Sequence, residues 1–282
     1  MRKLTVIIFS LLIVISALGQ EHKEIIRKNI PLPESKEAVL VVENIFGKID
    51  VEGYSGDAVL LEIESQINAD SQEKLEDAMK KVFLSFETRK DTVDVFVNGI
   101  CGCRQDHRRR NFDWDDQCDF NYRYDFKVKV PSRANLKIST VTDGEVTIRH
   151  ISGGVTARNV NGGITIEDVT GPTDVNCING DVEFKYAKNP VLNSKYYSLN
   201  GNVNVYYIPG LSADLSFKSF QGNMFTAFDI AEWLPPVKVS THSKDGAATT
   251  YRIENISAVR IGKGGVKLDF ETFNGNVFVR KI

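Results

Sequence analysis

The chain has 282 residues, with 35 basic and 37 acidic side chains and a formal net charge of −2. This mildly acidic balance gives no reason to expect a nucleic-acid partner. Without its first 19 residues the chain has about 260 residues, which fits one elongated domain or two small ones.

Residues 1–19 have the form of a secretory signal peptide. Arg2 and Lys3 precede an apolar run from Leu4 to Leu18, and Gly19 lies near a plausible cleavage point. The run is too short for a bilayer span, which needs roughly 20 residues, although an uncleaved anchor is the alternative. We therefore expect an exported mature chain, 20–282, of formal charge −4 without Arg2 and Lys3, with no membrane span. It would reside in the periplasm, on the cell surface or outside the cell.

Short strands are predicted in 38–63, where apolar residues alternate with polar ones and glycines mark the bends. One amphipathic helix follows over 71–82, capped by Asp70 or Ser71. We place it in an insertion of helix, strands and loop over about 65–126, which ends in a long alternating strand.

The segment 101–119 is the least regular stretch, dense in arginine and aspartate. In an exported protein, a disulfide from Cys118 to Cys101 or Cys103 is the favoured interpretation. Together with His107 these cysteines are weak candidates for a metal site, because their spacing matches no common zinc motif. Free thiols are the third possibility. We expect no cofactor and no catalytic residue.

A short unit ending in a polar residue and glycine recurs in the second half of the chain, with glycines 18, 18, 21 and 21 residues apart. Self-similarity at a fixed period predicts a single-stacked, all-β solenoid of about 18–21 residues per coil, with regular repeats over about 136–282. The recurring residues are Asp143, Asn161, Asn179, Asn200 and Gln221, each followed by Gly144, Gly162, Gly180, Gly201 or Gly222. We expect the glycines to supply positive φ at corners and the polar side chains to form a ladder, a structural role.

Alignment of the repeats in nines predicts three inward columns. They contain Val146, Val155, Ile164, Thr173 and Val182; Ile148, Ala157, Ile166, Val175 and Phe184; and Ile151, Val160, Val169 and Ile178. In the same alignment Cys177 is expected to be half-exposed, and His150 to pair with Asp168 one coil away. Arg280 and Lys281 are expected to protect a last strand at an open edge.

Two motifs carry a family resemblance: V-E-N-x-x-G-K-I-D-V-E-G-Y-x-G-D ending at Asp57, and Y-D-F-K-V-K-V-P ending at Pro131. With the repeated N-G units, they make nearly all of the mature chain resemble the bacterial "putative adhesin" domain family of exported β-solenoid proteins. The resemblance implies a surface or envelope protein, and it supplies no catalytic residues. It does not extend to residues 101–118.

The sequence therefore favours a non-enzymatic, adhesin-like protein that binds a glycan or another protein through its outer faces. One alternative is a polysaccharide-active β-helix enzyme, which would need acidic residues clustered in a groove. Another is an envelope scaffold or sensor that uses the Cys101–Cys118 loop. The sequence does not indicate an oligomeric state.

Overall fold

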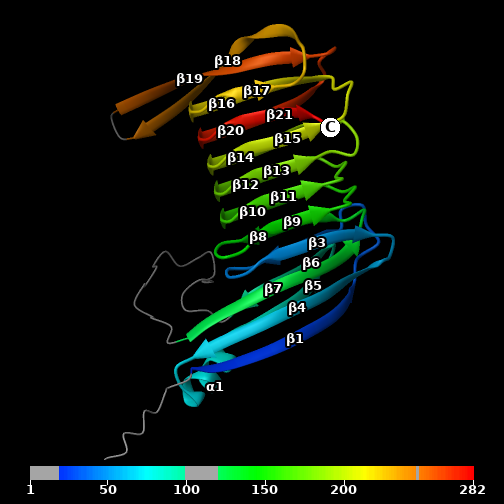
Figure 1. Cartoon of the computed structure of the whole chain (residues 1–282), viewed down its shortest axis with the longest axis vertical. Helices are drawn as coiled ribbons and strands as arrows, with labels where there is room; N and C mark the ends of the chain where they lie inside the picture. The colour runs from blue at the N-terminus through cyan, green and yellow to red at the C-terminus, as the bar shows by residue number, and fades with distance from the viewer. Residues whose placement is uncertain (1–18, 99–119, 246–247) are drawn as a thin grey trace, which may run out of the picture.

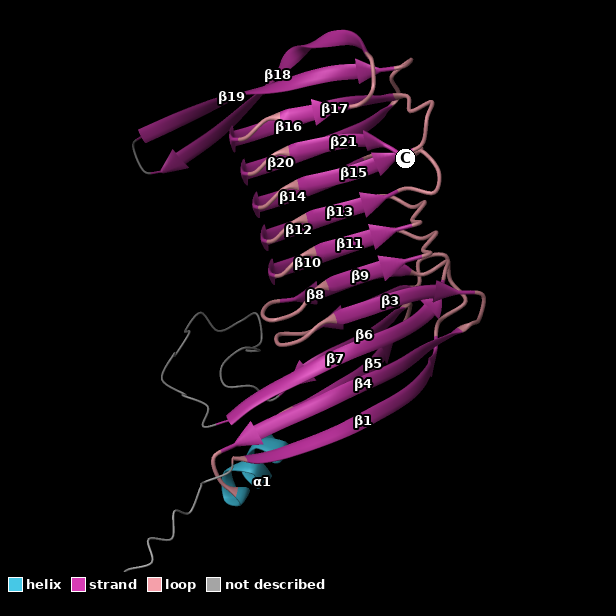
Figure 2. Cartoon of the chain, viewed as in Figure 1, coloured by secondary structure: helices cyan, strands magenta, loops and turns pink. Residues whose placement is uncertain are grey.

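The computed structural model describes residues 19–98, 120–245 and 248–282, and within 236–256 it describes the backbone alone. These residues form two large open sheets, with the helix α1 (Gln72–Lys81) at the N-terminal end (Figures 1 and 2). The prediction of an all-β chain with one small helix is confirmed. Ser71 caps the helix by accepting a hydrogen bond from the Lys74 backbone N–H at 3.3 Å.

Sheet A has ten strands, in the spatial order β1, β4, β7, β3, β9, β11, β13, β15, β21 and β17. In that order their bounds are Gln20–Pro31, Ala58–Ala69, Phe120–Pro131, Ile49–Tyr54, Val146–Arg149, Ile164–Glu167, Val182–Lys185, Val203–Tyr207, Val277–Lys281 and Met224–Thr226. Neighbours from β7 to β17 are parallel. Strand β4 is antiparallel to both β1 and β7.

Sheet B has eleven strands, in the order β18, β19, β16, β20, β14, β12, β10, β8, β2, β6 and β5. In that order their bounds are Ile230–Asp245, Ala248–Ile261, Ala213–Gln221, Val266–Asn274, Ser194–Asn200, Thr173–Asn179, Val155–Asn161, Asn135–Thr140, Val39–Glu43, Thr92–Asn98 and Phe83–Arg89. Neighbours from β16 to β6 are parallel. Antiparallel strands close both ends of this sheet.

A strand of sheet B, a corner and the following strand of sheet A make up what we call one coil. In spatial order the coils are β6–β7, β2–β3, β8–β9, β10–β11, β12–β13, β14–β15, β20–β21 and β16–β17. The region 65–126, predicted as an insertion, thus contributes β6 and β7 to the two sheets. In the sequence, residues 99–119 lie between these two strands and are outside the described residues.

The order of the coils in space departs from their order in the sequence at the C-terminal end (Figure 1). Coil β20–β21 lies between β14–β15 and β16–β17, because the hairpin β18–β19 already pairs with the outer edge of β16. A turn with positive φ at Gly262, Gly264 and Gly265 carries the chain back to the inner edge. The prediction that Arg280 and Lys281 protect an open edge is therefore wrong, since β21 pairs with β15 and β17.

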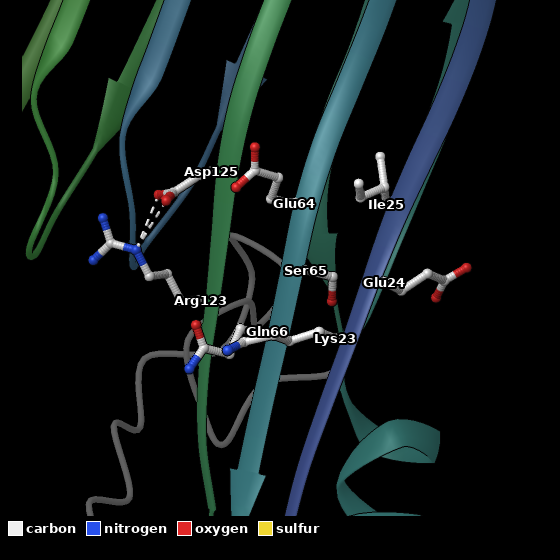
Figure 3. A pocket seen from close by; sticks show the side chains of 8 residues that line it. All are labelled: Lys23, Glu24, Ile25, Glu64, Ser65, Gln66, Arg123 and Asp125. Carbon is white, nitrogen blue, oxygen red and sulfur yellow. Dashed lines mark hydrogen bonds and ion pairs between the residues drawn. The ribbon is translucent and has the colours of Figure 1, made fainter.

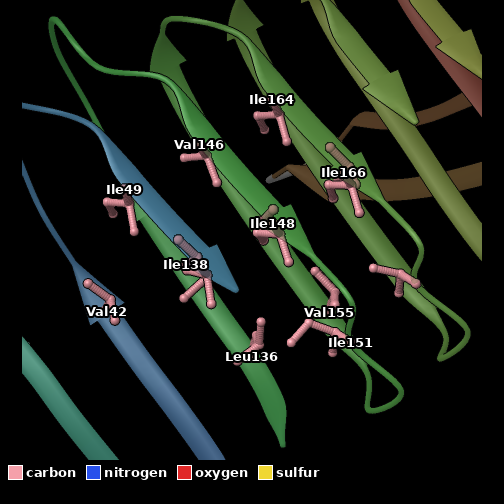
Figure 4. Close-up of a cluster of buried hydrophobic side chains, with 14 of the residues drawn as sticks. Val42, Ile49, Leu136, Ile138, Val146, Ile148, Ile151, Val155, Ile164 and Ile166 are labelled. Atoms are coloured by element: carbon pink, nitrogen blue, oxygen red, sulfur yellow. The ribbon is translucent and has the colours of Figure 1, made fainter. Parts of the chain in front are cut away.

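Side chains from both sheets fill the space between them. Figure 4 shows Ile49, Val146 and Ile164 from sheet A together with Leu136, Ile138 and Val155 from sheet B. The first two predicted inward columns are buried throughout. The third prediction is right for Ile151 and Val169 but wrong for Val160 and Ile178, which are half-exposed.

The half-coils differ in length, and this explains the error in the third column. Strands β9 and β11 have four residues and are followed by His150 and Asp168, whose positive φ values of 60° and 53° turn the next side chain inward. Strands β10 and β12 have seven residues and keep alternating, so Asn159 and Cys177 point inward instead. The repeat unit is the whole coil rather than nine residues.

Candidate functional site

Seven glycines stack at the corner of successive coils. In spatial order they are Gly47, Gly144, Gly162, Gly180, Gly201, Gly275 and Gly222. A Cβ added at Gly144, Gly162, Gly180 or Gly201 would overlap the carbonyl oxygen of the glycine in the adjacent coil. Only Gly47 and Gly162 of the seven have positive φ. The expectation that these glycines supply positive φ is therefore wrong for most of them. Glycine is needed at these corners because the backbones of neighbouring coils approach closely.

The amides beside these glycines are hydrogen-bonded to one another along the stack. Asn179 donates to Asn161 at 2.8 Å, and Asn200 donates to Asn179 at 2.9 Å. Asn274 then donates to Asn200 at 2.9 Å, because β20 rather than β16 is the next strand. Gln221 is in register with Asn274 and not with Asn200. Asp143 precedes Gly144 at the other end and has a positive φ of 56°.

A second row follows the glycines and was not anticipated from the sequence. The side-chain oxygens of Asp181, Asn202 and Asn276 each accept the backbone N–H of the corresponding residue one coil further. The donor N–H groups belong to Asn202, Asn276 and Asn223, at 2.7–2.9 Å. Aspartate or asparagine directly after N-G or Q-G was the signal that could have revealed this row.

A third polar column points into the space between the sheets, where the sequence predicts apolar side chains. It consists of Asn159, Cys177 and Ser198. The side chains of Asn159, Cys177 and Ser198 donate hydrogen bonds to the carbonyls of glycines one coil away, at 2.9, 3.2 and 2.9 Å. Those carbonyls are the ones crowded by the glycine stack, so each buried donor satisfies an acceptor that water does not reach. In the sequence, this column is marked by a polar residue three positions before the corner glycine of its own coil.

Cys177 is fully buried, so the expectation of a half-exposed thiol is wrong. Burial raises its pKa from 9.0 to about 11, and the charge of Asp181 acts in the same direction. A thiol of this kind is mostly protonated at neutral pH and poorly reactive.

We expect the free energy of unfolding to fall as the pH rises from 9 to 11. The folded state binds the thiol proton more tightly than the unfolded state does, so the stabilisation is complete below pH 9 and is lost through pH 11. The loss due to Cys177 is at most about 2.7 kcal/mol. Urea unfolding at both ends of this pH range measures it. The Cys177→Ser variant, whose hydroxyl can donate as that of Ser198 does, should lose less stability between pH 9 and pH 11. A variant with the same dependence of stability on pH as the wild type would contradict this account.

The outer face of sheet A carries opposite charges in successive coils. Arg149 lies 2.9 Å from Asp50 and 3.6 Å from Glu167, and Lys185 lies 3.2 Å from Glu167 and 2.7 Å from Glu183. These side chains are about one-third to one-half exposed, so each pair contributes little to stability. The carboxylates are paired with cations rather than grouped together.

His150 and Asp168 pair as predicted, with 3.3 Å between the His150 Nδ1 and an Asp168 carboxylate oxygen. Both side chains are about half exposed, and they lie on a corner between adjacent coils. The contact joins two coils at the surface.

Four phenylalanines distinguish the last two coils from the others. The segments F-Q-G-N-M-F (220–225) and F-N-G-N-V-F (273–278) are in register. The rings of Phe220 and Phe273 stack with centroids 4.8 Å apart, and those of Phe225 and Phe278 stack at 5.1 Å. We call these four rings and the amides between them the aromatic corner.

The aromatic corner is open to solvent. Phe220 is 71% exposed, Phe225 50% and Phe273 44%, which is unusual for rings of this size. Its amides are those of Gln221, Asn223, Asn274 and Asn276. Exposed rings flanking uncharged donors and acceptors form a surface that offers both apolar contact and hydrogen bonds.

A different hollow, of about 350 Å³, lies on strands β1, β4 and β7 at the N-terminal end (Figure 3). Arg123 and Asp125 pair with each other at 3.0 Å, and Lys23 pairs with Glu21 at 3.0 Å. The lining side chains spread along three strands without meeting at one point (Figure 3). This hollow is the weaker candidate, because its charges are already paired.

The disulfide and metal candidates Cys101, Cys103, His107 and Cys118 lie outside the described residues, so their pairing stays a prediction. Within the described ranges, no three His, Cys, Asp or Glu side chains are grouped as a metal site would require. No helix in these ranges is long and apolar enough to cross a membrane.

Comparison with known proteins shows distant structural similarity only. No family model and no curated relative matches the chain. A "putative cell adhesion protein" from Clostridium sporogenes has 12% identity and a TM-score of 0.36, covering 94% of this chain and 100% of its own. A "putative adhesin" from Bacteroides fragilis has 11% identity and a TM-score of 0.37, covering 91% and 97%. A "putative lipid binding protein" from Parabacteroides distasonis has 8% identity and a TM-score of 0.30, covering 94% and 98%.

Proposed function

We propose that this chain is an exported, non-enzymatic binding protein of the adhesin type. In this proposal the mature chain 20–282 is one elongated β-solenoid domain that displays its outer faces and corners outside the cytoplasm. The signal-like first 19 residues and the resemblance of the N-terminal motifs to exported adhesin-type proteins support export. The partner is a glycan or protein of the cell envelope or its surroundings.

The aromatic corner is the observation that carries the proposal, and an uncharged glycan is the partner that it fits best. The weakly positive C–H groups of a sugar ring can pack on the negative face of Phe220 or Phe273. Hydroxyl groups beside them can bond to the amides of Gln221 and Asn274, which donate and accept. None of the side chains of Phe220, Gln221, Phe273 and Asn274 is charged. The guanidinium of Arg280 lies on the other ring pair, 4.8 Å from the centroid of Phe278.

The double variant Phe220→Ala/Phe273→Ala tests this site. It is expected to weaken binding to neutral polysaccharides, such as cellulose, chitin or a soluble β-glucan, by about tenfold or more, because two rings lose their contact area. Affinity electrophoresis in gels that contain each polysaccharide measures the effect. The matched control, Ile178→Ala/Leu199→Ala, removes apolar side chains from the same outward column in other coils and should bind as the wild type does.

Two outcomes would overturn the proposal. One is an unchanged affinity for every bound polysaccharide in the phenylalanine variant. The other is release of new reducing ends by the wild-type chain, which would favour the alternative of a polysaccharide-active enzyme.

A further inference from the structure

The edge of sheet A at β17 is unpaired within the described residues. Asn223 accepts from the Val277 N–H at 2.9 Å, and the Ala227 N–H donates to Val279 at 2.9 Å. Backbone groups in a strand alternate in direction, so those of Met224 and Thr226 point away from β21 toward the free edge. A further strand could bond to them.

The other sheet edges carry the charges or prolines that discourage strand addition. Strand β1 includes Glu21, Lys23 and Arg27, and β5 includes Glu87 and Arg89. The sequence of β18 contains two consecutive prolines and several charged residues. By contrast, β17 reads Met-Phe-Thr and has neither.

An apolar hollow of about 210 Å³ lies beside β17, between this strand and the hairpin β18–β19. Its lining includes Leu215, Phe217, Met224, Ile230 and Val259, with Trp233 also present and 73% exposed. In the coils from β8–β9 to β20–β21, each inward side chain is covered by the inward side chain of the next coil. Met224 continues the column of Val203 and Val277, and it is only partly buried.

We propose that β17 binds an extended, uncharged peptide segment of a partner protein as an added strand, with an apolar side chain in this hollow. Strand β21 of this chain shows that a strand of this kind fits against β17, because Val277 pairs with Met224 and Phe278 stacks on Phe225. Main-chain hydrogen bonds to Met224 and Thr226 supply affinity, and the hollow selects the side chain. The site uses Phe225 on the sheet A side of the aromatic corner, whereas the glycan contact is proposed for Phe220 and Phe273 on its sheet B side.

The absence of charge on β17 decides the chemistry of the occupant. A basic or acidic strand would gain no ion pair with Met224, Phe225 or Thr226 and would lose hydration there. A segment that alternates apolar and aromatic residues would instead place one kind in the hollow and the other over the exposed ring of Phe225.

Fluorescence anisotropy on the mature full chain tests the proposal, with a labelled peptide T-F-N-G-N-V-F-V that copies residues 272–279 and has no charged side chain. We expect saturable binding that the Phe225→Lys variant weakens about tenfold or more, because a lysine at an edge opposes strand addition. Thr165→Lys is the matched control. It places the same charge in the same outward-facing column, but on β11, which is paired on both sides, and it should leave binding unchanged.

A peptide with N-methylated backbone amides should not bind, which isolates main-chain pairing from apolar adhesion. The proposal is overturned if neither peptide binds, if both bind equally, or if Phe225→Lys and Thr165→Lys behave alike. It is also overturned if binding makes residues 262–282 sensitive to protease, since the peptide would then displace the native strand. Self-association through this edge without peptide binding would identify a second copy as the occupant instead.

Discussion

Replacing Gly201 by alanine is expected to lower the free energy of unfolding by about 3 kcal/mol or more. The new Cβ would overlap the carbonyl oxygen of Gly180, a backbone atom held between two coils. Relief requires the coils to separate, which would also lengthen the hydrogen bond from Asn200 to Asn179 and that from Ser198 to Gly180.

Gly154→Ala is the control for this effect. Its Cβ would meet the Asn135 side-chain oxygen at 3.2 Å and no backbone atom closer, so a small side-chain shift accommodates it. The loss should stay within about 1 kcal/mol. Urea unfolding followed by far-ultraviolet circular dichroism compares the two variants. Equal losses would mean that the glycine stack is not the tight contact that the geometry indicates.

Replacing Phe270 by alanine is expected to cost about 3–5 kcal/mol, because the ring is only 1% exposed in the middle of the stack. It stacks on Tyr196 at 5.0 Å on one side and is in register with Phe217 on the other. Phe217→Ala should cost only about 1–2 kcal/mol, since that ring is half-buried in the last coil and lines the hollow beside β17.

This pair of variants tests the order of the coils directly. If the coils stacked in sequence order, Phe217 would lie inside and Phe270 at the end, and the larger loss would move to Phe217→Ala. Equilibrium unfolding of both variants under one condition distinguishes the two arrangements. A third variant, Phe184→Ala, provides the reference for a ring buried in either arrangement.

The sequence predicts the central coils well because each one repeats the same constraints. Glycine recurs where neighbouring coils come close, and apolar residues recur at period two on the inner faces of β9 to β13. Periodicity of this kind can be recognised in the sequence without knowledge of tertiary contacts. The helix at Gln72–Lys81 was predictable for a similar reason, since its cap and apolar stripe are local.

The buried polar column can be predicted from an alignment of whole coils but not from the alignment in nines. Asn159, Cys177 and Ser198 precede their corner glycines by three residues, and the pattern recurs at Thr272. Alignment in nines treated two unequal half-coils as equivalent and therefore moved the inward position by one residue. A coil-length alignment separates the two strands and places these residues inside.

The position of β20–β21 could not be predicted from local pattern. Val203, Val277 and Met224 are all apolar, and Asn200, Asn274 and Gln221 are all amides, so the coils fit one another in more than one order. The hairpin β18–β19 decides the outcome, because it already occupies the outer edge of β16. That pairing joins residues 40 to 48 positions apart, and such a contact produces no periodic pattern in the sequence.

The place of β20–β21 also bears on how the protein matures. Strands β14–β15 and β16–β17 come before β20–β21 in the sequence, so the end of the stack cannot take its described form until residues 266–282 are available to separate them. Any early contact between those two coils has to open again. Residues 266–282 therefore complete the stack, since a chain that lacks them lacks the coil between β14–β15 and β16–β17.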